Sequence, residues 1–451
     1  MRMPTVRRVA TRSGSAPRVL IVVQNLSVPL DRRVWLESQA LVAAGYGVSV
    51  ICPRGEGDAA FEVLRGVRIH RYRPPAPASG FLSYVWEFAY CWVRTAALSA
   101  RVLRREGFDV LQLCNPPDTY WLLALLYRLG GKRSVLDHHD LCPEVYDARF
   151  PEGRPSVRRV LVALERASLR TVDRVISTNE SYRQVALDRG GVPRAKTTVV
   201  RSGPNTEQLY RGQPRPELRR GGRFLCVYLG VMGPQDRVDL VVRAADVIVN
   251  QVGRTDCRFA LLGFGDCLEE LRALTTALGL DDYVSFTGRA DDAMIREYLS
   301  TADLGLSPDP KTPFNELSTM NKTLEYMAFG LPVVALDLKE TRVSAGPAAV
   351  YVREEGPAAY AEAICALLDD PATRAAMGAT GAERIRDRLG WRHQAQAYVG
   401  VYDELLGTTR APAAGSEPAG FTRGRPDGAG RNGTHDTAAS VDAAITKGPQ
   451  P

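Results

Sequence analysis

The 451-residue sequence has little cysteine and histidine, and it lacks a long uninterrupted apolar run. Its eight cysteines are Cys52, Cys91, Cys114, Cys142, Cys226, Cys257, Cys267 and Cys365. No two of them form a C-x-x-C pair, which argues against a disulfide framework and against a thiolate zinc site. The apolar run Val19–Val23 is too short for a secretory signal and continues as an ordinary strand. We therefore expect a cytoplasmic protein with reduced thiols.

The best candidate for a membrane segment is Phe81–Ala100, with the sequence FLSYVWEFAYCWVRTAALSA. Glu87 and Arg94 interrupt this stretch. Two charges in so aromatic a run favour an amphipathic helix packed on the protein over a transmembrane span. A helix lying on a membrane surface is the alternative.

Several enzyme signatures are also missing. The sequence contains no G-x-S-x-G, no Walker A sequence and no H-E-x-x-H. The glycine turn Gly263–Asp266 (GFGD) lacks the third glycine of a dinucleotide fingerprint, because Leu268 stands there. No D-x-D pair that would clamp a metal-bound diphosphate occurs. We therefore expect a site without a metal and without a bound cofactor.

The formal net charge of +7 is unevenly distributed along the chain. The residues before Val19 carry five arginines and no acid, and the tail from Thr408 onward adds +1, so the long middle of the chain is close to neutral. This distribution disfavours nucleic-acid binding by the folded part. The basic leader is either solvated or in contact with an anionic membrane surface.

Short β-branched runs alternate with stretches of helical period, a pattern typical of parallel sheets covered by helices. In the first half the predicted strands are Arg18–Gln24, Val48–Cys52, Val67–Tyr72, Asp109–Cys114, Ser134–Asp137, Arg174–Ser177 and Thr198–Arg201. The predicted helices there are Arg33–Ala44, Phe81–Arg105, Thr119–Leu129, Val157–Thr171 and Ser181–Arg189. In the second half the predicted strands are Phe224–Leu229, Arg258–Leu262, Val284–Thr287, Leu304–Ser307, Val333–Leu336 and Ala349–Val352. The sequence thus predicts an α/β fold of two doubly wound, Rossmann-like domains that face a cleft.

The predicted organisation has six parts. They are a basic flexible leader at 1–16, a first domain at 17–209, a linker at 210–222, a second domain at 223–390, a helix at 391–406 that packs back on the first domain, and a disordered tail at 407–451. The linker is assigned to the stretch rich in proline, glycine and arginine, and the tail to a segment with almost no large apolar residues.

The most informative segment is Pro308–Pro332, PDPKTPFNELSTMNKTLEYMAFGLP. Ser318 and Thr319 suit an N-cap, so we expect a helix that begins near Thr319, directly after a loop that leaves a strand. Such a helix start binds a diphosphate through free N–H groups and its dipole. Asn321 and Glu325 lie one turn apart, and Glu325 can accept both hydroxyls of a ribose while Lys322 balances phosphate charge. The alternative is a capped surface helix with a Lys–Glu pair.

Leu136–Glu144 (LDHHDLCPE) is the second candidate for chemistry, because it places two of the five histidines at the end of a predicted strand. His139 followed by Asp140 is the pair of interest, and a buried, hydrogen-bonded histidine is the alternative. A metal centre is disfavoured, since adjacent imidazoles point apart and no third ligand is suitably spaced.

A third candidate is Gln24–Arg33 (QNLSVPLDRR), which joins the first strand to the first helix. Either Arg32 and Arg33 bind an anionic acceptor or a leaving phosphate, or Asp31 caps the helix and the two arginines are solvated.

Residues Asn321–Val334 resemble the donor-site signature of retaining GT-B glycosyltransferases of the family 4 type (group 1). Leu261–Asp266 (LLGFGD), Phe286–Arg289 (FTGR) and Thr301–Leu306 (TADLGL) resemble further motifs of that family, as do two segments of the first half, Asp173–Glu180 (DRVISTNE) and Val199–Asn205 (VVRSGPN). The resemblance extends from about Pro17 to Leu406. It implies an acceptor-binding first domain and a donor-binding second domain.

The residues that the resemblance assigns to the donor are Gly263, Gly265, Arg289, Ser318, Thr319, Asn321, Lys322, Thr323, Leu324 and Glu325. It implies catalytic roles for His139, Asp140 and Glu325, with His139 facing the transferred sugar. The sequence departs from the family at Leu317, where a second glutamate is common, and at Val231 and Asp236, where an arginine and a lysine are common. Charge on the diphosphate is then balanced by Lys322, Arg289 or Arg237, or by helix N-termini.

The resemblance implies transfer of a hexose-type sugar from a nucleoside diphosphate, UDP or GDP, to a glycan, a glycolipid or a lipid-linked acceptor. The aromatic region Tyr84–Trp92 and the basic leader suit a lipid-linked acceptor at the inner face of a membrane. Two alternatives stay open, a sugar-nucleotide epimerase of the same fold and a non-catalytic scaffold that binds no nucleotide.

Overall fold

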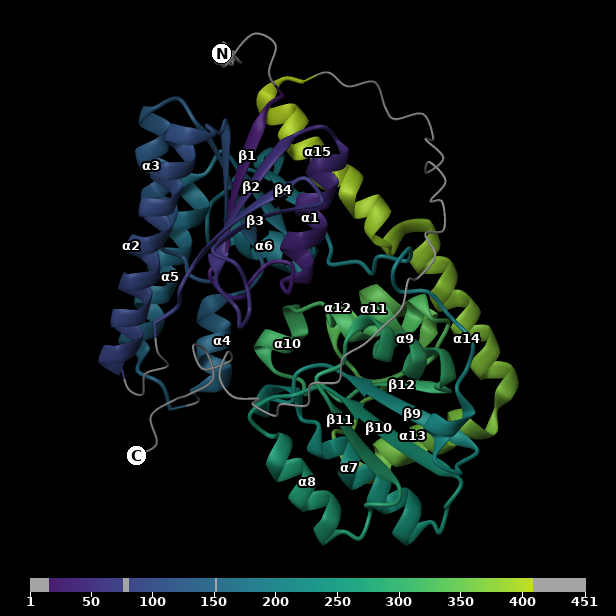
Figure 1. Cartoon of the computed structure of the whole chain (residues 1–451). Helices are drawn as coiled ribbons and strands as arrows, with labels where there is room; N and C mark the ends of the chain where they lie inside the picture. The colour runs from purple at the N-terminus through teal and green to yellow at the C-terminus, as the bar shows by residue number, and fades with distance from the viewer. Residues whose placement is uncertain (1–15, 76–80, 151, 409–451) are drawn as a thin grey trace.

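A computed structural model describes residues 16–75, 81–150 and 152–408. The chain forms two α/β domains, one above the other in Figure 1, with the last helix running from the second back to the first. The predicted flexible leader and disordered tail fall almost entirely on residues 1–15 and 409–451, outside the described residues. All eight cysteines are free.

The first domain contains an eight-stranded sheet in the order β3-β4-β2-β1-β5-β6-β7-β8. Its strands are β1 (Arg18–Val22), β2 (Gly47–Pro53), β3 (Phe61–Leu64), β4 (Val67–Tyr72), β5 (Val110–Cys114), β6 (Arg133–His138), β7 (Arg174–Ser177) and β8 (Thr197–Val199). All neighbours are parallel except β3 and β4. β3 was not predicted from the sequence, because this short edge strand exposes Phe61 and Val63 and lacks the apolar run of a central strand.

Helices cover both faces of this sheet. They are α1 (Arg32–Ala43), α2 (Phe81–Arg105), α3 (Trp121–Leu129), α4 (Cys142–Arg149), α5 (Pro155–Thr171) and α6 (Glu180–Asp188). The helices α2, α3 and α5 stand together on one side of the domain (Figure 1), and their inner residues form one apolar cluster with the sheet. The short helix α4 was not predicted, since it buries only Pro143 and Glu144 and has no apolar stripe.

The second domain contains an all-parallel six-stranded sheet in the order β11-β10-β9-β12-β13-β14. Its strands are β9 (Phe224–Leu229), β10 (Cys257–Leu262), β11 (Val284–Gly288), β12 (Leu304–Ser307), β13 (Val333–Leu336) and β14 (Ala349–Val352). The α-helices are α7 (Asp239–Asp246), α8 (Leu268–Ala277), α9 (Asp292–Thr301), α10 (Pro313–Leu317), α11 (Asn321–Ala328), α12 (Lys339–Ala345), α13 (Pro357–Asp369) and α14 (Pro371–Arg384). Because the strands are parallel, their carboxyl ends meet at one edge, where such folds bind ligands.

The final helix, α15 (Trp391–Leu406), returns to the first domain and packs against α1 and the sheet. The chain passes between the domains twice, and the two passes touch, since Trp391 N–H donates to the carbonyl of Pro204 over 3.0 Å. A Cβ on Gly203 would lie 2.1 Å from the carbonyl oxygen of Leu389, so only glycine permits this approach. The two covalent connections between the domains therefore lie side by side.

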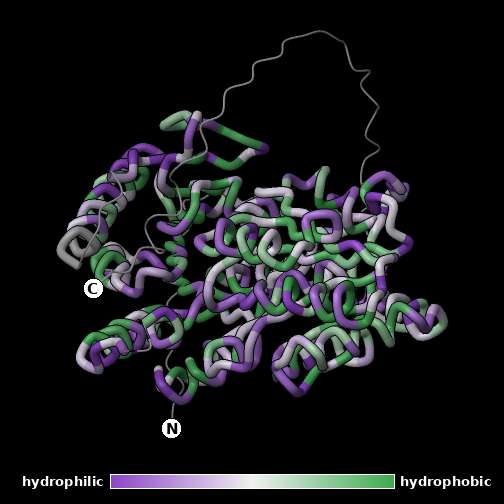
Figure 2. The backbone as a smooth tube through the Cα atoms, turned by 90° about the horizontal axis from the view of Figure 1, so that it is seen from below, coloured by the Kyte–Doolittle hydropathy of each residue, from purple (hydrophilic) through white to green (hydrophobic). Residues whose placement is uncertain are grey.

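The described part of the chain contains no helix that is both long and apolar enough to cross a membrane. Figure 2 shows hydrophilic and hydrophobic residues mixed along the backbone.

The buried hydroxyl of Tyr326 bridges two strands of the second sheet. It accepts from Leu229 N–H of β9 over 2.8 Å and donates to the Leu306 carbonyl of β12 over 3.1 Å. Gly305 provides the space, because a Cβ there would lie 2.3 Å from the Tyr326 ring. The Tyr326 side chain thereby fixes α11 on the sheet.

We predict that Tyr326→Phe lowers the free energy of unfolding by about 1–3 kcal/mol, because it leaves two buried backbone groups unpaired. Urea denaturation followed by circular dichroism measures the change. The matched control is Tyr283→Phe, whose hydroxyl has no hydrogen-bond partner in the described part of the chain. An equal loss in both variants would contradict the role assigned to the hydroxyl.

Candidate active-site cleft

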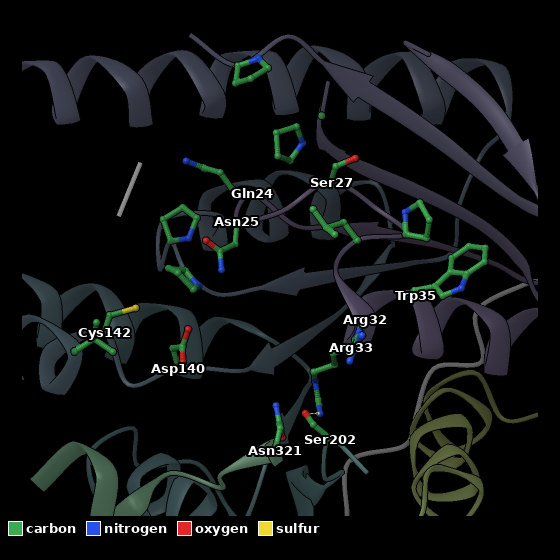
Figure 3. A pocket seen from close by; sticks show the side chains of 18 of the residues that line it. Gln24, Asn25, Ser27, Arg32, Arg33, Trp35, Asp140, Cys142, Ser202 and Asn321 are labelled. Carbon is green, nitrogen blue, oxygen red and sulfur yellow. Dashed lines mark hydrogen bonds between the residues drawn. The ribbon is translucent and has the colours of Figure 1, made fainter. Parts of the chain in front are cut away.

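A cleft of about 3460 Å³ lies between the two domains and contacts both. Figure 3 shows its upper wall, with Gln24, Asn25 and Ser27 from the loop after β1, and Asp140 and Cys142 from the segment after β6. Asn321 projects from α11 below them. The cleft thus lies at the carboxyl ends of the strands of both sheets, as expected from the sequence.

Helix α11 begins at Asn321, so the prediction of a start near Thr319 was wrong. Its N-cap is Met320, with no side-chain cap. Ser318 instead ends the short helix α10, and Thr319 accepts a hydrogen bond from Asn179 of the first domain over 3.0 Å. Thr312 caps α10, so Pro313–Leu317 form a separate short helix before α11 begins. The first N–H groups of α11 therefore lack a side-chain partner.

Only part of the predicted donor set on α11 faces the cleft. Asn321 and Glu325 line it, one turn apart. Thr323 and Leu324 are fully buried in the second domain. Ser318 is buried as well, with its hydroxyl 3.0 Å from that of Tyr182. Ser318, Thr323 and Leu324 therefore position the helix, and their side chains do not reach a ligand in the cleft.

Lys322 does not line the cleft, contrary to the expected contact with a phosphate. Its ammonium lies 2.5 Å from Asp309 and 3.9 Å from Asp236. Burial alone would lower the pKa of Lys322, but Asp309 and Asp236 together raise it, so the group stays charged. Burial in turn raises the pKa of Asp236 to about 6. Asp236, which departs from the family pattern, thus belongs to a buried ionic cluster.

The two glycines of the predicted donor turn, Gly263 and Gly265, contact backbone rather than the cleft. Both have positive φ. A Cβ on Gly263 would lie 1.8 Å from the Gly230 carbonyl, and one on Gly265 would lie 2.7 Å from the Met232 carbonyl. Glycine is required here because the loop after β10 packs directly on the loop after β9.

The two other predicted cations differ. Arg289 lines the cleft and stacks on the Phe264 ring, 4.7 Å from its centroid. Arg237 points away, because it pairs with Glu355 over 2.7 Å, and the expectation that it faces the cleft was wrong.

The remaining departures from the family pattern are peripheral. Val231 is half-exposed, and Glu316, the acidic residue directly before Leu317, lies 3.8 Å from Lys311. Neither residue lines the cleft, and Leu317 does not line it either.

Arg32 crosses the cleft and joins the domains. Its guanidinium lies 3.1 Å from Glu325 and 2.6 Å from Asp292, both in the second domain. Burial raises the pKa of Glu325, and Arg32 opposes that shift. Asp31 caps α1 by accepting from Val34 N–H, so the capping alternative was right for Asp31. Arg32 keeps 47% of its side-chain surface exposed but reaches the opposite domain, and Arg33 keeps 9% and pairs inside the first domain, so neither arginine is a free solvated group.

Arg33 forms the centre of a buried ionic cluster. It donates to both carboxylate oxygens of Asp137, over 2.7 and 3.1 Å, and lies 3.1 Å from Glu37. It also donates to Ser202, as Figure 3 shows. The donors of Arg33 are thus occupied inside the first domain, although the residue also lines the cleft.

His139 belongs to the same cluster. Its Nε2 lies 2.5 Å from Asp137, and its side chain keeps 16% of its surface exposed. Burial alone would raise the pKa of Asp137, but Arg33 and His139 hold it well below its usual range. The side-chain atoms of Glu37, Cys114, Asp137 and His139 that could bind a metal ion all lie within 4.8 Å of one another. The positive charge beside these groups is the guanidinium of Arg33.

The cluster continues through Gln112 of β5 to the last helix. The Gln112 amide donates to Glu37 over 2.7 Å, and its carbonyl accepts from Tyr398 over 2.5 Å and from Tyr402. A continuous chain of polar contacts therefore links α15 to His139.

Asp140 lines the cleft directly, and burial raises its pKa. Its neighbour His138 is fully buried and lies 3.3 Å from Glu165. Of the two adjacent histidines, only His139 keeps part of its side chain exposed, and neither of them lines the cleft.

Sequence reasoning missed Asp118, Asp137 and Asp292. Asp118 also lines the cleft and is 5% exposed. The sequence does indicate Asp118 as a candidate, because it follows the strand Val110–Cys114 in the sequence Asn-Pro-Pro-Asp, at the sheet edge where active sites lie.

Two protein families match the chain. The family described as "Glycosyl transferase 4-like domain" matches residues 30–203, and "Glycosyl transferases group 1" matches residues 223–370. The two matches fall on the two domains of the fold.

Curated relatives include the D-inositol 3-phosphate glycosyltransferases of Kineococcus radiotolerans and Thermobispora bispora. The first is 27% identical over 435 residues, covering 90% of this chain and 94% of the relative. The second is 27% identical over 337 residues, covering 70% of this chain and 75% of the relative.

Solved structures share the fold. Sucrose-phosphate synthase from Thermosynechococcus elongatus has a TM-score of 0.67 at 20% identity, covering 87% of this chain and 100% of that chain. Anabaena HepE in complex with UDP and glucose has a TM-score of 0.63 at 16% identity, covering 86% of this chain and 100% of that chain.

The pH dependence of stability tests the buried state of Asp118. Burial raises the pKa of its carboxyl to about 6. The folded chain therefore binds more protons at this group than the unfolded chain, and the free energy of unfolding falls as pH rises from about 4 to about 6.

We predict that Asp118→Asn raises the free energy of unfolding at pH 8 by about 1–3 kcal/mol and changes it little at pH 4. Urea denaturation across this range measures both values. The exposed Asp282→Asn is the control, with no change expected at either pH. A gain in Asp118→Asn that is equal at the two pH values would disprove the assignment.

Proposed function

The chain belongs to the group 1 glycosyltransferases, nucleotide-sugar-dependent enzymes of the GT-B fold, and from this premise we propose that it transfers a hexose from UDP or GDP to a glycan, glycolipid or lipid-linked acceptor. The proposal includes retention of the anomeric configuration and a cytoplasmic site of action at the inner face of a membrane.

One observation carries the donor assignment. Asn321 and Glu325 face the cleft from the first two turns of α11, a helix that starts without a side-chain cap. The free N–H groups and the helix dipole attract the diphosphate, and Glu325 accepts hydrogen bonds from the ribose hydroxyls. Asn321 lies at the helix start, beside the place proposed for the diphosphate.

In this proposal, donor binding changes the position of the Arg32 guanidinium. In the free protein its guanidinium is held by Glu325 and Asp292. A ribose that bonds to Glu325 competes with Arg32, which is then free to approach the diphosphate from the first domain. Arg289 lines the cleft from the second domain.

Bond cleavage leaves negative charge on the departing nucleoside diphosphate. We assign its stabilisation to the α11 start, Arg32 and Arg289, groups fixed before the reaction begins. Asp137 fixes the orientation of His139, which faces the transferred sugar in the proposed complex. Closure of the cleft excludes water that would hydrolyse the donor.

The acceptor lies against the first domain in this proposal. Apolar side chains of α2 and α5 line that part of the cleft, among them Phe88, Val157, Leu161 and Leu164. This wall suits the hydrocarbon of a lipid-linked acceptor.

The names of the relatives favour a second candidate, an inositol phosphate acceptor. Arg54, Arg73, Arg149 and Arg154 line the same part of the cleft and suit a phosphate. The two candidates differ in whether a soluble acceptor suffices.

The test incubates the purified chain with UDP-, GDP- and ADP-sugars and measures binding, hydrolysis, epimerisation and transfer to both acceptor classes. We predict that Glu325→Gln weakens nucleotide binding by about 10- to 100-fold, because a charge-assisted hydrogen bond is lost. His139→Ala lowers kcat by at least about 100-fold with little change in nucleotide affinity.

Glu316→Gln is the matched control, since Glu316 does not line the cleft, and we expect nearly full activity. Epimerisation without an acceptor supports the epimerase alternative, and failure to bind any nucleotide supports the scaffold alternative. Parent-like behaviour of both Glu325→Gln and His139→Ala would refute the site.

A further inference from the structure

The outer face of α3 is a stripe of exposed leucines. Leu122, Leu125, Leu126 and Leu129 are 45%, 41%, 58% and 88% exposed. Their spacing places them on one side of the helix, opposite the buried Leu123, Ala124 and Tyr127. A helix with apolar side chains on both faces is unusual at a protein surface, and it indicates a partner for the outer face.

The helix α3 lies between two helices rich in arginine (Figure 1). It contacts α2 through the hydroxyl pairs Thr95–Tyr120 and Ser99–Tyr127, and it contacts α5, where Arg128 donates to the Thr171 carbonyl. The order across this face of the domain is therefore α2, α3, α5.

The three helices carry nine arginines and two glutamates, a formal +7 that equals the net charge of the whole chain. The arginines, all exposed, are Arg94, Arg101, Arg104, Arg105, Arg128, Arg158, Arg159, Arg166 and Arg170. Neither acid of these helices offsets the arginines on the outer face, because Glu165 is buried beside His138 and Glu87 lines the cleft, and of the nine arginines Arg158 pairs with Asp147 of α4 over 2.6 Å. The expectation that the basic charge belongs to the leader therefore misses a segregated basic face on the folded chain.

Further exposed apolar side chains lie on the two neighbouring helices. On α2, Trp86 and Val93 are 65% and 60% exposed and share the outer side with Arg101 and Arg104. On α5, Val160 is 57% exposed. An apolar centre with guanidinium groups on both sides is the arrangement that binds an anionic lipid surface.

We propose that the outer face of α2, α3 and α5 binds the surface of an anionic bilayer, with the α3 leucines inserted among the acyl chains and the arginines at the headgroups. This inference deepens the membrane contact of the proposed function by naming the surface that makes it. It rests on that proposal only for the lipid-borne nature of the acceptor.

A second copy of the chain is a poorer occupant of this face. In a two-fold dimer the same patch meets itself, and the arginines of both copies would face each other without acids to neutralise them. Anionic lipid headgroups supply the missing negative charge.

The position of the face fits its proposed use. Phe88 and Cys91 of α2 and Val157 and Leu161 of α5 line the cleft. The helices that would contact the bilayer therefore also form a wall of the acceptor side, so a lipid-borne acceptor has a short path into the cleft.

The test is co-sedimentation of the full chain with vesicles of phosphatidylglycerol and phosphatidylcholine, and with vesicles of phosphatidylcholine alone. We expect binding to the anionic vesicles that weakens as salt is added. Replacing Leu122, Leu125, Leu126 and Leu129 together by glutamine, or Arg101 and Arg104 together by glutamate, lowers the partition coefficient by more than about tenfold.

Two full-length controls separate this face from other surfaces. Val252→Gln with Val343→Gln removes exposed apolar side chains of the second domain, and we expect unchanged vesicle binding. Replacing Arg2, Arg7, Arg8 and Arg12 by glutamine removes the charge of the leader, and binding to anionic vesicles is expected to persist. Nucleotide binding by the leucine variant confirms that it is folded.

Three results would overturn the proposal. They are equal binding of the parent to neutral and anionic vesicles, loss of binding in the leader variant but not in the leucine variant, and a dimer of the parent that the leucine substitutions dissociate while vesicle binding is absent. Glu325→Gln separates this proposal from the proposed function, because it is expected to lose nucleotide affinity and keep vesicle binding.

Discussion

The buried ion pair between Arg33 and Asp137 connects the parts of the molecule that matter most. Arg33 is the second residue of α1, Asp137 is the last residue but one of β6, and the same guanidinium holds Glu37 and Ser202. Removing one partner of such a buried pair costs about 3–5 kcal/mol, because the other charge stays buried without compensation. The placement of His139, the position of the segment after β8 and the polar contacts of α15 all depend on this one interaction.

Arg32 and Arg33 are neighbours in sequence with opposite tasks. Successive residues of a helix point about 100° apart, so one guanidinium enters the first domain and the other crosses the cleft. The pair in the sequence indicated a charged site at this loop but not which arginine would serve it. That choice depends on Asp137 and Glu325, more than 100 and 290 residues away.

The strands were predictable because parallel strands buried on both faces read as continuous apolar runs, as Phe224–Leu229 and Val333–Leu336 do. The start of α11 was not, because Ser318 and Thr319 are good caps whose hydroxyls bond to Tyr182 and Asn179 of the other domain. The position of Lys322 was not predictable for a related reason. Asp309, its partner, lies thirteen residues earlier, and only the folded chain brings the two together. The charge of the surface was hidden in the same way, because the nearly neutral sum over the long middle of the chain conceals three adjacent helices that carry nine arginines and two glutamates.

The contact between the two interdomain crossings limits how the cleft can change shape. The two segments that connect the domains touch at Gly203 and are joined by the hydrogen bond from Trp391 N–H to the Pro204 carbonyl. Their contact can act as a short hinge axis. Sliding and twisting of one domain against the other would break that contact, whereas rotation about it would not. A rotation that opens the cleft would also pull Arg32 away from Glu325 and Asp292, so those salt bridges oppose it.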